Sequence, residues 1–179
     1  LPHKKILADG LLSFDKKEEL IPLLWKKLSE FHPRMQVNLL DYIRYASANW
    51  KDEMLSMLET SQDMEIQIAC VRYFGRYQDE RSVSFLLHHA KEEKEGVWEL
   101  QNACISSLAM YPGPQTLEIL KKEIYSKNRY VRHNAAKRLA ALNTEMDALA
   151  DILQGNDRYA KEMLEYQLDA AKAQRRAGL

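Results

Sequence analysis

The sequence is poor in several residue types, and each shortage excludes a class of protein. Two cysteines in 179 residues cannot form a disulfide framework, which favours a reducing compartment or a fold indifferent to redox state. Six glycines and five prolines are too few for collagen-like, linker-like or many-turned β structures. No apolar run approaches the roughly 20 residues that a membrane-spanning helix needs, so we expect no direct membrane insertion.

An excess of charge of one sign is also missing. The sequence has 26 basic and 26 acidic residues, and its formal net charge is zero. Proteins that bind nucleic acid or anionic membranes electrostatically usually carry a basic excess. We therefore do not expect nucleic acid as a partner.

The chain has the size and composition of one globular domain. Hydrophobic residues make up 46% of it and charged residues 29%, and domains typically contain about 100–200 residues. The sequence begins Leu1-Pro2-His3, with no Met and no signal-peptide pattern. We interpret it as a fragment of a longer cytoplasmic protein, and a membrane tether upstream of residue 1 stays open.

Five segments of the sequence resemble one another at intervals of about 30 residues. They begin at Val37, Ile66, Leu100, Val131 and Ala160. Within them, apolar residues at the first, fifth, ninth and twelfth positions fall on one side of a helix. A shorter amphipathic segment precedes each, such as residues 114–125, where Leu117, Leu120 and Ile124 are spaced i, i+3, i+7. The pattern predicts a repeated pair of helices.

Helix start signals agree with these pairs. Pro22 and Pro114 are expected in the first turn of a shorter helix, where a missing N–H costs nothing. Asp63, Asn128 and Asp157 come just before longer helices, and their side chains are expected to act as N-caps.

The repeated pattern resembles the second helix of HEAT repeats, most closely the short bacterial HEAT-like repeats related to the phycobilin-lyase type. The segments that carry the resemblance best are Val131-Arg132-x-x-Ala135-Ala136-x-x-Leu139-Ala140-x-Leu142 and Ile66-Gln67-x-x-Cys70-x-x-x-Phe74-Gly75-x-x-x-Asp79. The resemblance covers residues 16–171. It is weaker in the first and last repeats, as expected for repeats that cap the two ends of a stack of repeats. The resemblance implies an all-α fold, a right-handed α–α superhelix (solenoid) of about five helical hairpins, in a bacterial protein.

The resemblance predicts a single HEAT-repeat domain over residues 1–179. The expected repeats span residues 16–50, 51–79, 80–113, 114–143 and 144–171. Residues 1–15 are expected to form a truncated or capping helix, and residues 172–179 a solvated tail.

Cys70 and Cys104 occupy the same position in adjacent repeats, and Ala135 occupies it in the next. Small side chains there let neighbouring helices approach closely. Packed helices lie about 8–10 Å apart, whereas a disulfide needs Cα atoms within about 7 Å. We expect two separate buried thiols.

In a stack of this kind the second helices line the concave side, which solenoids use to bind partners. Positions 3, 7 and 11 of these helices are expected to point outward, Ile68 and Met110 among them. The residues expected to bind a partner on this face are Arg72, Arg76, Asn102, Ser106, His133, Lys137 and Tyr166.

The pair His88-His89 raises the question of a metal site. Adjacent helix residues point about 100° apart, and Zn²⁺ needs three or four convergent ligands. No Cys or carboxylate is placed to complete such a set. We interpret both residues as surface histidines and expect neither a metal nor a cofactor.

Asp41 occupies a position where other repeats carry Cys, Ala or Leu, with Tyr42, Tyr45 and Trp50 near it in the sequence. A desolvated carboxylate beside aromatic side chains is how an active site can begin. The alternative is that the first repeat packs out of register and Asp41 meets solvent or Arg44.

The three tryptophans are expected to fill the core and the seams between helices, because their spacing is irregular for a stacking surface. They are Trp25, Trp50 and Trp98.

The expected function is a non-catalytic protein–protein interaction scaffold or adaptor, because the sequence contains no catalytic motif. Its partner would be another protein or a domain of the same chain, and no small-molecule substrate is expected. The resemblance leaves an enzyme or enzyme accessory open as the alternative. It would be similar to the HEAT-like DNA glycosylases, which use an acidic residue and aromatics in a basic cleft, or to a bilin-lyase subunit.

Overall fold

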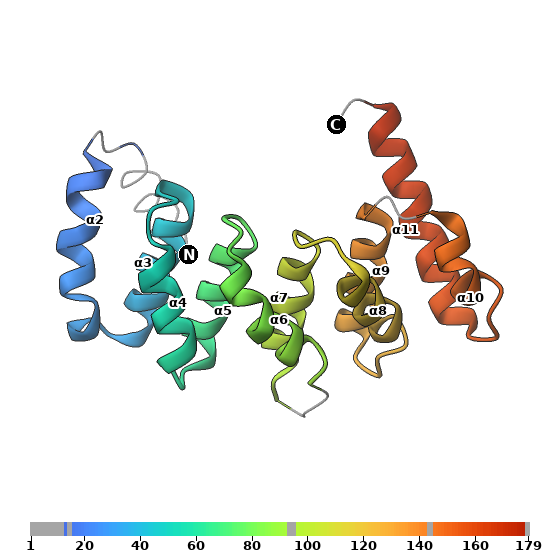
Figure 1. Ribbon diagram of the computed structural model, residues 1–179, viewed down its shortest axis with the longest axis horizontal. Helices are drawn as coiled ribbons and strands as arrows, with labels where there is room; N and C mark the ends of the chain where they lie inside the picture. Colours follow the sequence, from blue (N-terminus) through green and yellow to red (C-terminus); the bar gives the residue numbers. More distant parts are fainter. Residues whose placement is uncertain (1–12, 14–15, 93–95, 143–144, 178–179) are drawn as a thin grey trace. The chain divides into compact units, whose positions relative to one another are not determined.

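The fold is all-α, as the sequence predicts. The computed structural model describes residue 13 and residues 16–92, 96–142 and 145–177, which contain ten α-helices, three short 3-10 helices and no strand (Figure 1). The helix expected within residues 1–15 lies outside the described residues, apart from Ser13. Among the described helices, none is both long enough and apolar enough to cross a membrane.

The chain divides into two compact units, and the first is residues 1–79. Its described helices are α2 (Lys17–Lys26), η1 (Leu28–Glu30), α3 (Pro33–Ala46), α4 (Lys51–Thr60) and α5 (Met64–Phe74). Helix α5 packs against both α3 and α4. The largest fully buried side chains of this unit come from all four α-helices, and include Ile21, Leu40, Ile43, Met54, Leu58, Tyr73 and Phe74.

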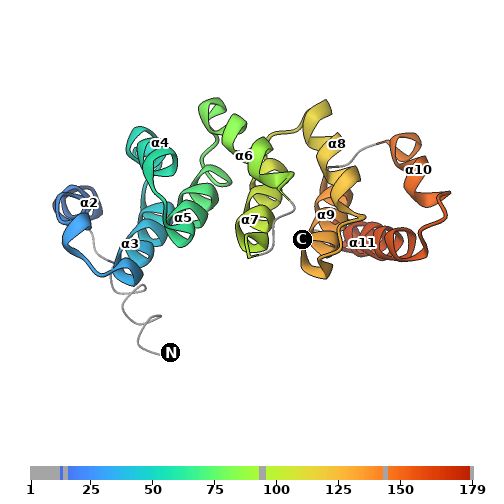
Figure 2. The same cartoon turned by 90° about the horizontal axis from the view of Figure 1, so that it is seen from below.

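The second unit, residues 80–179, begins where the third repeat was expected to begin. Its helices are η2 (Glu80–Ser82), α6 (Val83–Ala90), α7 (Trp98–Leu108), α8 (Pro114–Glu123), α9 (Arg129–Ala141), η3 (Met146–Leu149), α10 (Ala150–Leu153) and α11 (Arg158–Arg176). Within this unit α7, α9 and α11 lie side by side, and α6, α8 and α10 form a second layer on one side of them (Figure 2). Helix α9 is central, since it packs against α7, α8 and α11. Helix α11 continues beyond residue 172, where a tail was expected.

The three predicted N-caps are confirmed. Asp63 accepts hydrogen bonds from the backbone N–H groups of Glu65 and Ile66. Asn128 accepts from Tyr130 and Val131. Asp157 accepts from Ala160 at the start of α11. Each longer helix of repeats two, four and five therefore begins at the residue that the sequence indicated.

The two proline predictions differ in outcome. Pro114 begins α8, as expected. The prediction for Pro22 is wrong, because α2 already begins at Lys17 and Pro22 lies inside it. A proline at that position cannot donate a hydrogen bond to the carbonyl of Glu18. The first turn of α2 is formed by polar residues that the apolar periodicity does not mark.

The prediction that Ile68 points outward is wrong, since only 4% of this residue is exposed. Helix α5 is covered by α3 on one side and by α4 on another. Seven of its residues are therefore buried, and a single apolar stripe does not describe it. Arg72 is exposed, so the outward positions of this helix are fewer than the repeat pattern predicts.

The cysteine prediction is confirmed, because Cys70 and Cys104 are both buried free thiols. Burial raises the pKa of Cys70 to about 12. Burial, and to a lesser degree the charge of Glu92, raises the pKa of Cys104. Both side chains are therefore protonated and unreactive in the folded protein at neutral pH.

We predict that iodoacetamide labels the two thiols only through unfolding. The thiolate is the reactive form, and in the folded chain it is withheld by both burial and the raised pKa. At pH 8, mass spectrometry should show labelling at the rate of global opening, and rapid labelling in denaturant. Because the folded-state pKa lies above the ordinary value, the stability contributed by these thiols is complete below about pH 9 and falls as the pH rises toward 12. Rapid labelling without denaturant would contradict the buried placement.

A second prediction concerns the start of α9. Asn128→Ala removes the acceptor for two backbone N–H groups and should lower the free energy of unfolding by about 1 kcal/mol. Asn128→Asp keeps an acceptor of equal quality and should stay close to the parent. Urea denaturation monitored by circular dichroism measures both. Equal losses in the two variants would show that the cap does not act through this hydrogen bond.

Candidate functional site

Helix α9 carries the largest excess of basic over acidic residues among the helices of the second unit. The helix carries Arg129, Arg132, Lys137 and Arg138 together with His133, and it contains no acidic residue. Arg129, His133 and Lys137 are exposed and spaced i, i+4, i+8, so they form one row along the helix. The apolar residues Val131, Ala135 and Leu139 are fully buried on another side.

An aromatic pair adjoins the start of this row. Trp98 begins α7, and its ring stacks on that of Tyr130 in α9, with ring centroids 5.1 Å apart and planes 21° apart. The guanidinium of Arg129 lies over the Tyr130 ring at 4.7 Å and also donates a hydrogen bond to its hydroxyl. Tyr130 is half exposed, so part of this stack is open to solvent. Trp98 therefore forms a surface stack, whereas Trp25 and Trp50 of the first unit contact each other in a seam, at 5.2 Å.

Helix α11 adds further aromatic side chains beside α9. Tyr159 and Tyr166, spaced i, i+7, are 70% and 68% exposed. The guanidinium of Arg132 lies 5.8 Å from the centre of the Tyr159 ring. The Nε atom of Arg132 is buried and donates no hydrogen bond to another described residue. We call this surface the basic–aromatic face, defined by Trp98, Arg129, Tyr130, Arg132, His133, Lys137, Tyr159 and Tyr166.

A buried asparagine fixes α9 against α7. The side-chain amide of Asn134 donates to the backbone carbonyl of Asn102 at 3.0 Å, to its side-chain oxygen at 2.8 Å and to the hydroxyl of Ser106 at 2.8 Å. The Asn134 carbonyl oxygen in turn accepts from Arg138 Nε at 3.3 Å. Burial lowers the pKa of this guanidinium. The network couples the position of the basic row to the neighbouring helix.

The structure distributes the seven expected partner-binding residues over both units. Arg72 and Arg76 belong to the first unit, where Arg76 lies 5.6 Å from the ring centres of both Tyr45 and Tyr77. The second unit holds Asn102, Ser106, His133, Lys137 and Tyr166. Among these, His133, Lys137 and Tyr166 are exposed, while Asn102 and Ser106 are half-buried acceptors of the Asn134 network.

Sequence reasoning missed the residues at the helix starts. Trp98, Arg129 and Tyr130 come before or at the first position of the repeated pattern, so a rule based on positions 3, 7 and 11 does not reach them. Tyr159 is missed for the same reason, and Arg132, at the second position of its segment, also falls outside the rule. The absence of acidic residues from residues 129–141 was a readable signal for the basic row.

Asp41 is explained by an ion pair, as one of its two interpretations expected. The Asp41 carboxylate lies 2.9 Å from Nη2 of Arg44, one helical turn later. About a third of the Asp41 side chain is exposed. The Arg44 guanidinium also lies 4.4 Å from the centre of the Tyr45 ring. The arrangement gives no support to a glycosylase-like carboxylate at this position.

The expectation that no carboxylate completes a set with His88 and His89 is wrong. Glu92 follows the end of α6, and its Oε2 lies 2.8 Å from His89 Nδ1. One ligand atom from each of His88, His89 and Glu92 lies within 4.8 Å of the others. The chain turns after Ala90, and this brings Glu92 back to the histidines although the helical pattern has ended.

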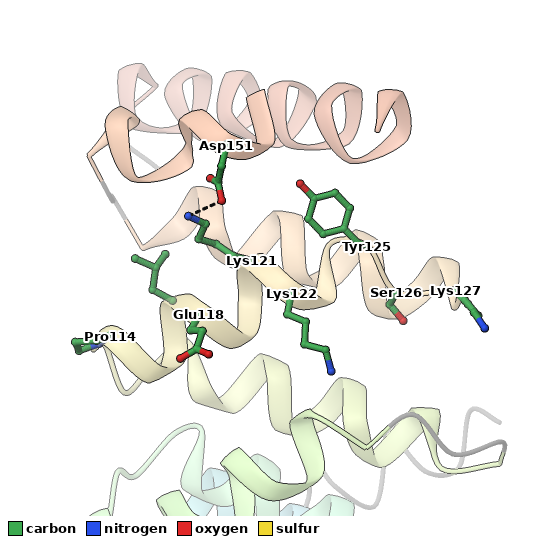
Figure 3. Close-up of a pocket in the computed structure, with 9 residues that line it drawn as sticks. Pro114, Glu118, Lys121, Lys122, Tyr125, Ser126, Lys127 and Asp151 are labelled. Atoms are coloured by element: carbon green, nitrogen blue, oxygen red, sulfur yellow. Dashed lines mark ion pairs between the residues drawn. The ribbon is translucent and has the colours of Figure 1, made fainter. Parts of the chain in front are cut away.

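A shallow hollow of about 650 Å³ lies between α8 and α10 of the second unit (Figure 3). Lys121 crosses it, 2.8 Å from Asp151 Oδ2, and also donates to the carbonyl of Ala148 at 2.8 Å. The hydroxyl end of Tyr125 lies near this pair, and burial together with the charges of Asp151 and Asp157 raises its pKa. Lys121 thus connects α8 to both η3 and α10. We therefore interpret the hollow as a consequence of how α8 and α10 pack, and not as a binding site.

Comparison with known proteins yields no relative: no protein-family model, no curated protein and no solved structure matches the chain.

We predict that Asn134→Leu lowers the free energy of unfolding by about 1–3 kcal/mol, because it removes the buried amide that donates to the half-buried acceptors of Asn102 and Ser106. Lys137→Ala, on the exposed side of the same helix, is the control and should change stability by less than about 0.5 kcal/mol. Urea denaturation of both variants makes the comparison. If the Asn134→Leu variant is as stable as the parent, the hydrogen bonds of Asn134 do not hold α9 against α7.

Proposed function

We propose that the protein is a HEAT-like interaction module that binds an acidic segment of a partner protein on the basic–aromatic face. The single observation that carries the proposal is the composition of α9, which presents a row of basic side chains and no acidic residue between aromatic side chains of α7 and α11. The packing of helix pairs in two layers within the second unit supports the HEAT-like part of the proposal. Arg72 and Arg76 belong to the first unit and stay predictions from the repeat pattern.

The side chains of this face fit a peptide with carboxylates. Arginine donors pair with carboxylates in a charge-assisted and often bidentate way, and exposed tyrosine and tryptophan rings supply contact area at a low cost in side-chain entropy. Arg129 and Arg132 each lie beside an aromatic ring, which restricts their orientation before a partner arrives.

A duplex nucleic acid fits this face less well than a peptide. Phosphate contacts dominate duplex affinity, and they require cations spread over a wide surface. Here the cations are concentrated on one helix, and α11 beside it carries Glu162 and Glu165. Glu162 already pairs with Arg158 at 2.6 Å. The chain as a whole has no excess of positive charge.

The proposal predicts that short random peptides selected on the purified chain are rich in Asp and Glu. Arg129→Glu combined with Lys137→Glu should weaken the binding of a selected peptide at least about tenfold, or about 1.4 kcal/mol. Lys26→Glu combined with Lys27→Glu, at exposed positions where α2 ends, makes the same change in net charge and should leave affinity within about twofold. Fluorescence anisotropy at physiological ionic strength measures the affinities.

Three results would contradict the proposal. Selected peptides without acidic residues would remove charge as the basis of recognition. Equal losses in the two double variants would show that net charge, and not this face, controls binding. A duplex DNA of random sequence that displaces the peptide at similar concentration would move the protein to the nucleic-acid class.

A further inference from the structure

The C-terminal end of α6 gathers three potential metal ligands. His88 and His89 lie in the last turn of the helix, and Glu92 lies two residues after its final residue, Ala90. The spacing from His88 to Glu92 is i, i+4, which is the spacing of helical metal ligands. The ligand atoms of the three residues lie within 4.8 Å of one another.

Two of the three residues are held in place. The His89 and Glu92 side chains are about a fifth exposed, and their Nδ1 and Oε2 atoms are 2.8 Å apart. The His89 ring also contacts the Phe85 ring, with centroids 4.2 Å apart. His88 is exposed and lies edge-on to His89 at 4.8 Å, so its ring can turn toward the pair without giving up a buried position.

The distances suit a small transition-metal ion after a modest adjustment. Bonds of about 2.0–2.2 Å from Zn²⁺ to nitrogen and oxygen place neighbouring ligands of a tetrahedral site roughly 3.3–3.5 Å apart. The present spread of 4.8 Å is larger by little more than an ångström, which rotation of His88 can supply. The helix C-terminus adds partial negative charge at this point and favours a cation. The ammonium of Lys91 opposes it, since Lys91 lines the same surface hollow as His88 and Glu92.

We propose that His88, His89 and Glu92 bind one Zn²⁺ ion, with its fourth position open to water. Two imidazoles and one carboxylate match the ligands of open zinc sites. Mg²⁺ and Ca²⁺ prefer oxygen ligands alone, so the two histidines select against them. Zinc would take the place of the direct contact between His89 Nδ1 and Glu92 Oε2, and it would connect the end of α6 to Glu92 beyond it.

Isothermal titration calorimetry of the metal-free chain with Zn²⁺ tests the site directly. We expect one ion per chain, and at least about tenfold weaker binding in His89→Ala and in Glu92→Gln. Glu92→Gln keeps the size of the side chain, so it tests the ligand even where loss of the His89–Phe85 contact disturbs folding. The matched control is His133→Ala, an exposed histidine on α9, which should bind Zn²⁺ like the parent.

Thermal denaturation separates binding to the folded chain from binding to the unfolded chain. A ligand that binds the folded state raises Tm. Zn²⁺ should therefore raise Tm of the parent and of His133→Ala, and should raise it little in Glu92→Gln. The proposal is overturned when the parent binds no Zn²⁺, when Glu92→Gln binds as tightly as the parent, or when Zn²⁺ leaves the Tm of the parent unchanged.

Discussion

The candidate face depends on how α9 is held in the second unit. The helix contacts α7, α8 and α11, and its buried side is lined by small and aliphatic residues such as Ala135, Ala136 and Leu139. Small side chains allow close approach, and close approach lets the Asn134 amide reach both Asn102 and Ser106 on α7. An unmade hydrogen bond at a buried amide is costly, so this network selects one register between the two helices. This register also determines which side chains of α9 face solvent.

The surface follows from that register. With the apolar residues of α9 committed to the core, Arg129, His133 and Lys137 fall in one exposed row. Aromatic rings from two other helices meet the same helix: Trp98 stacks on Tyr130, and Tyr159 lies beside Arg132. Cations held against rings lose less freedom on binding than cations on a solvated helix. The face is therefore built for recognition by the same contacts that hold the helices together.

Much of the fold could be predicted from the sequence, and the reasons are local. Asp63, Asn128 and Asp157 act as caps because a short polar side chain just before a helix can accept hydrogen bonds from the free backbone N–H groups of its first turn. Periodicity failed where a helix is covered on more than one side, as Ile68 shows on α5. It also failed where a helix starts in polar sequence, as Pro22 shows on α2. The residues of the two sites were harder to predict. Trp98 and Tyr130 are far apart in the sequence and are brought together by helix packing, and Glu92 meets His89 in a turn after α6 has ended.

The central claim is that an acidic segment binds across α9, and amide hydrogen exchange of the chain with and without a bound acidic peptide tests it most directly. The account predicts slower exchange at the starts of α7, α9 and α11, where Trp98, Arg129 and Tyr159 lie, and unchanged exchange in α8. Slower exchange confined to α8 or to the helices of the first unit, with α9 unchanged, would contradict it.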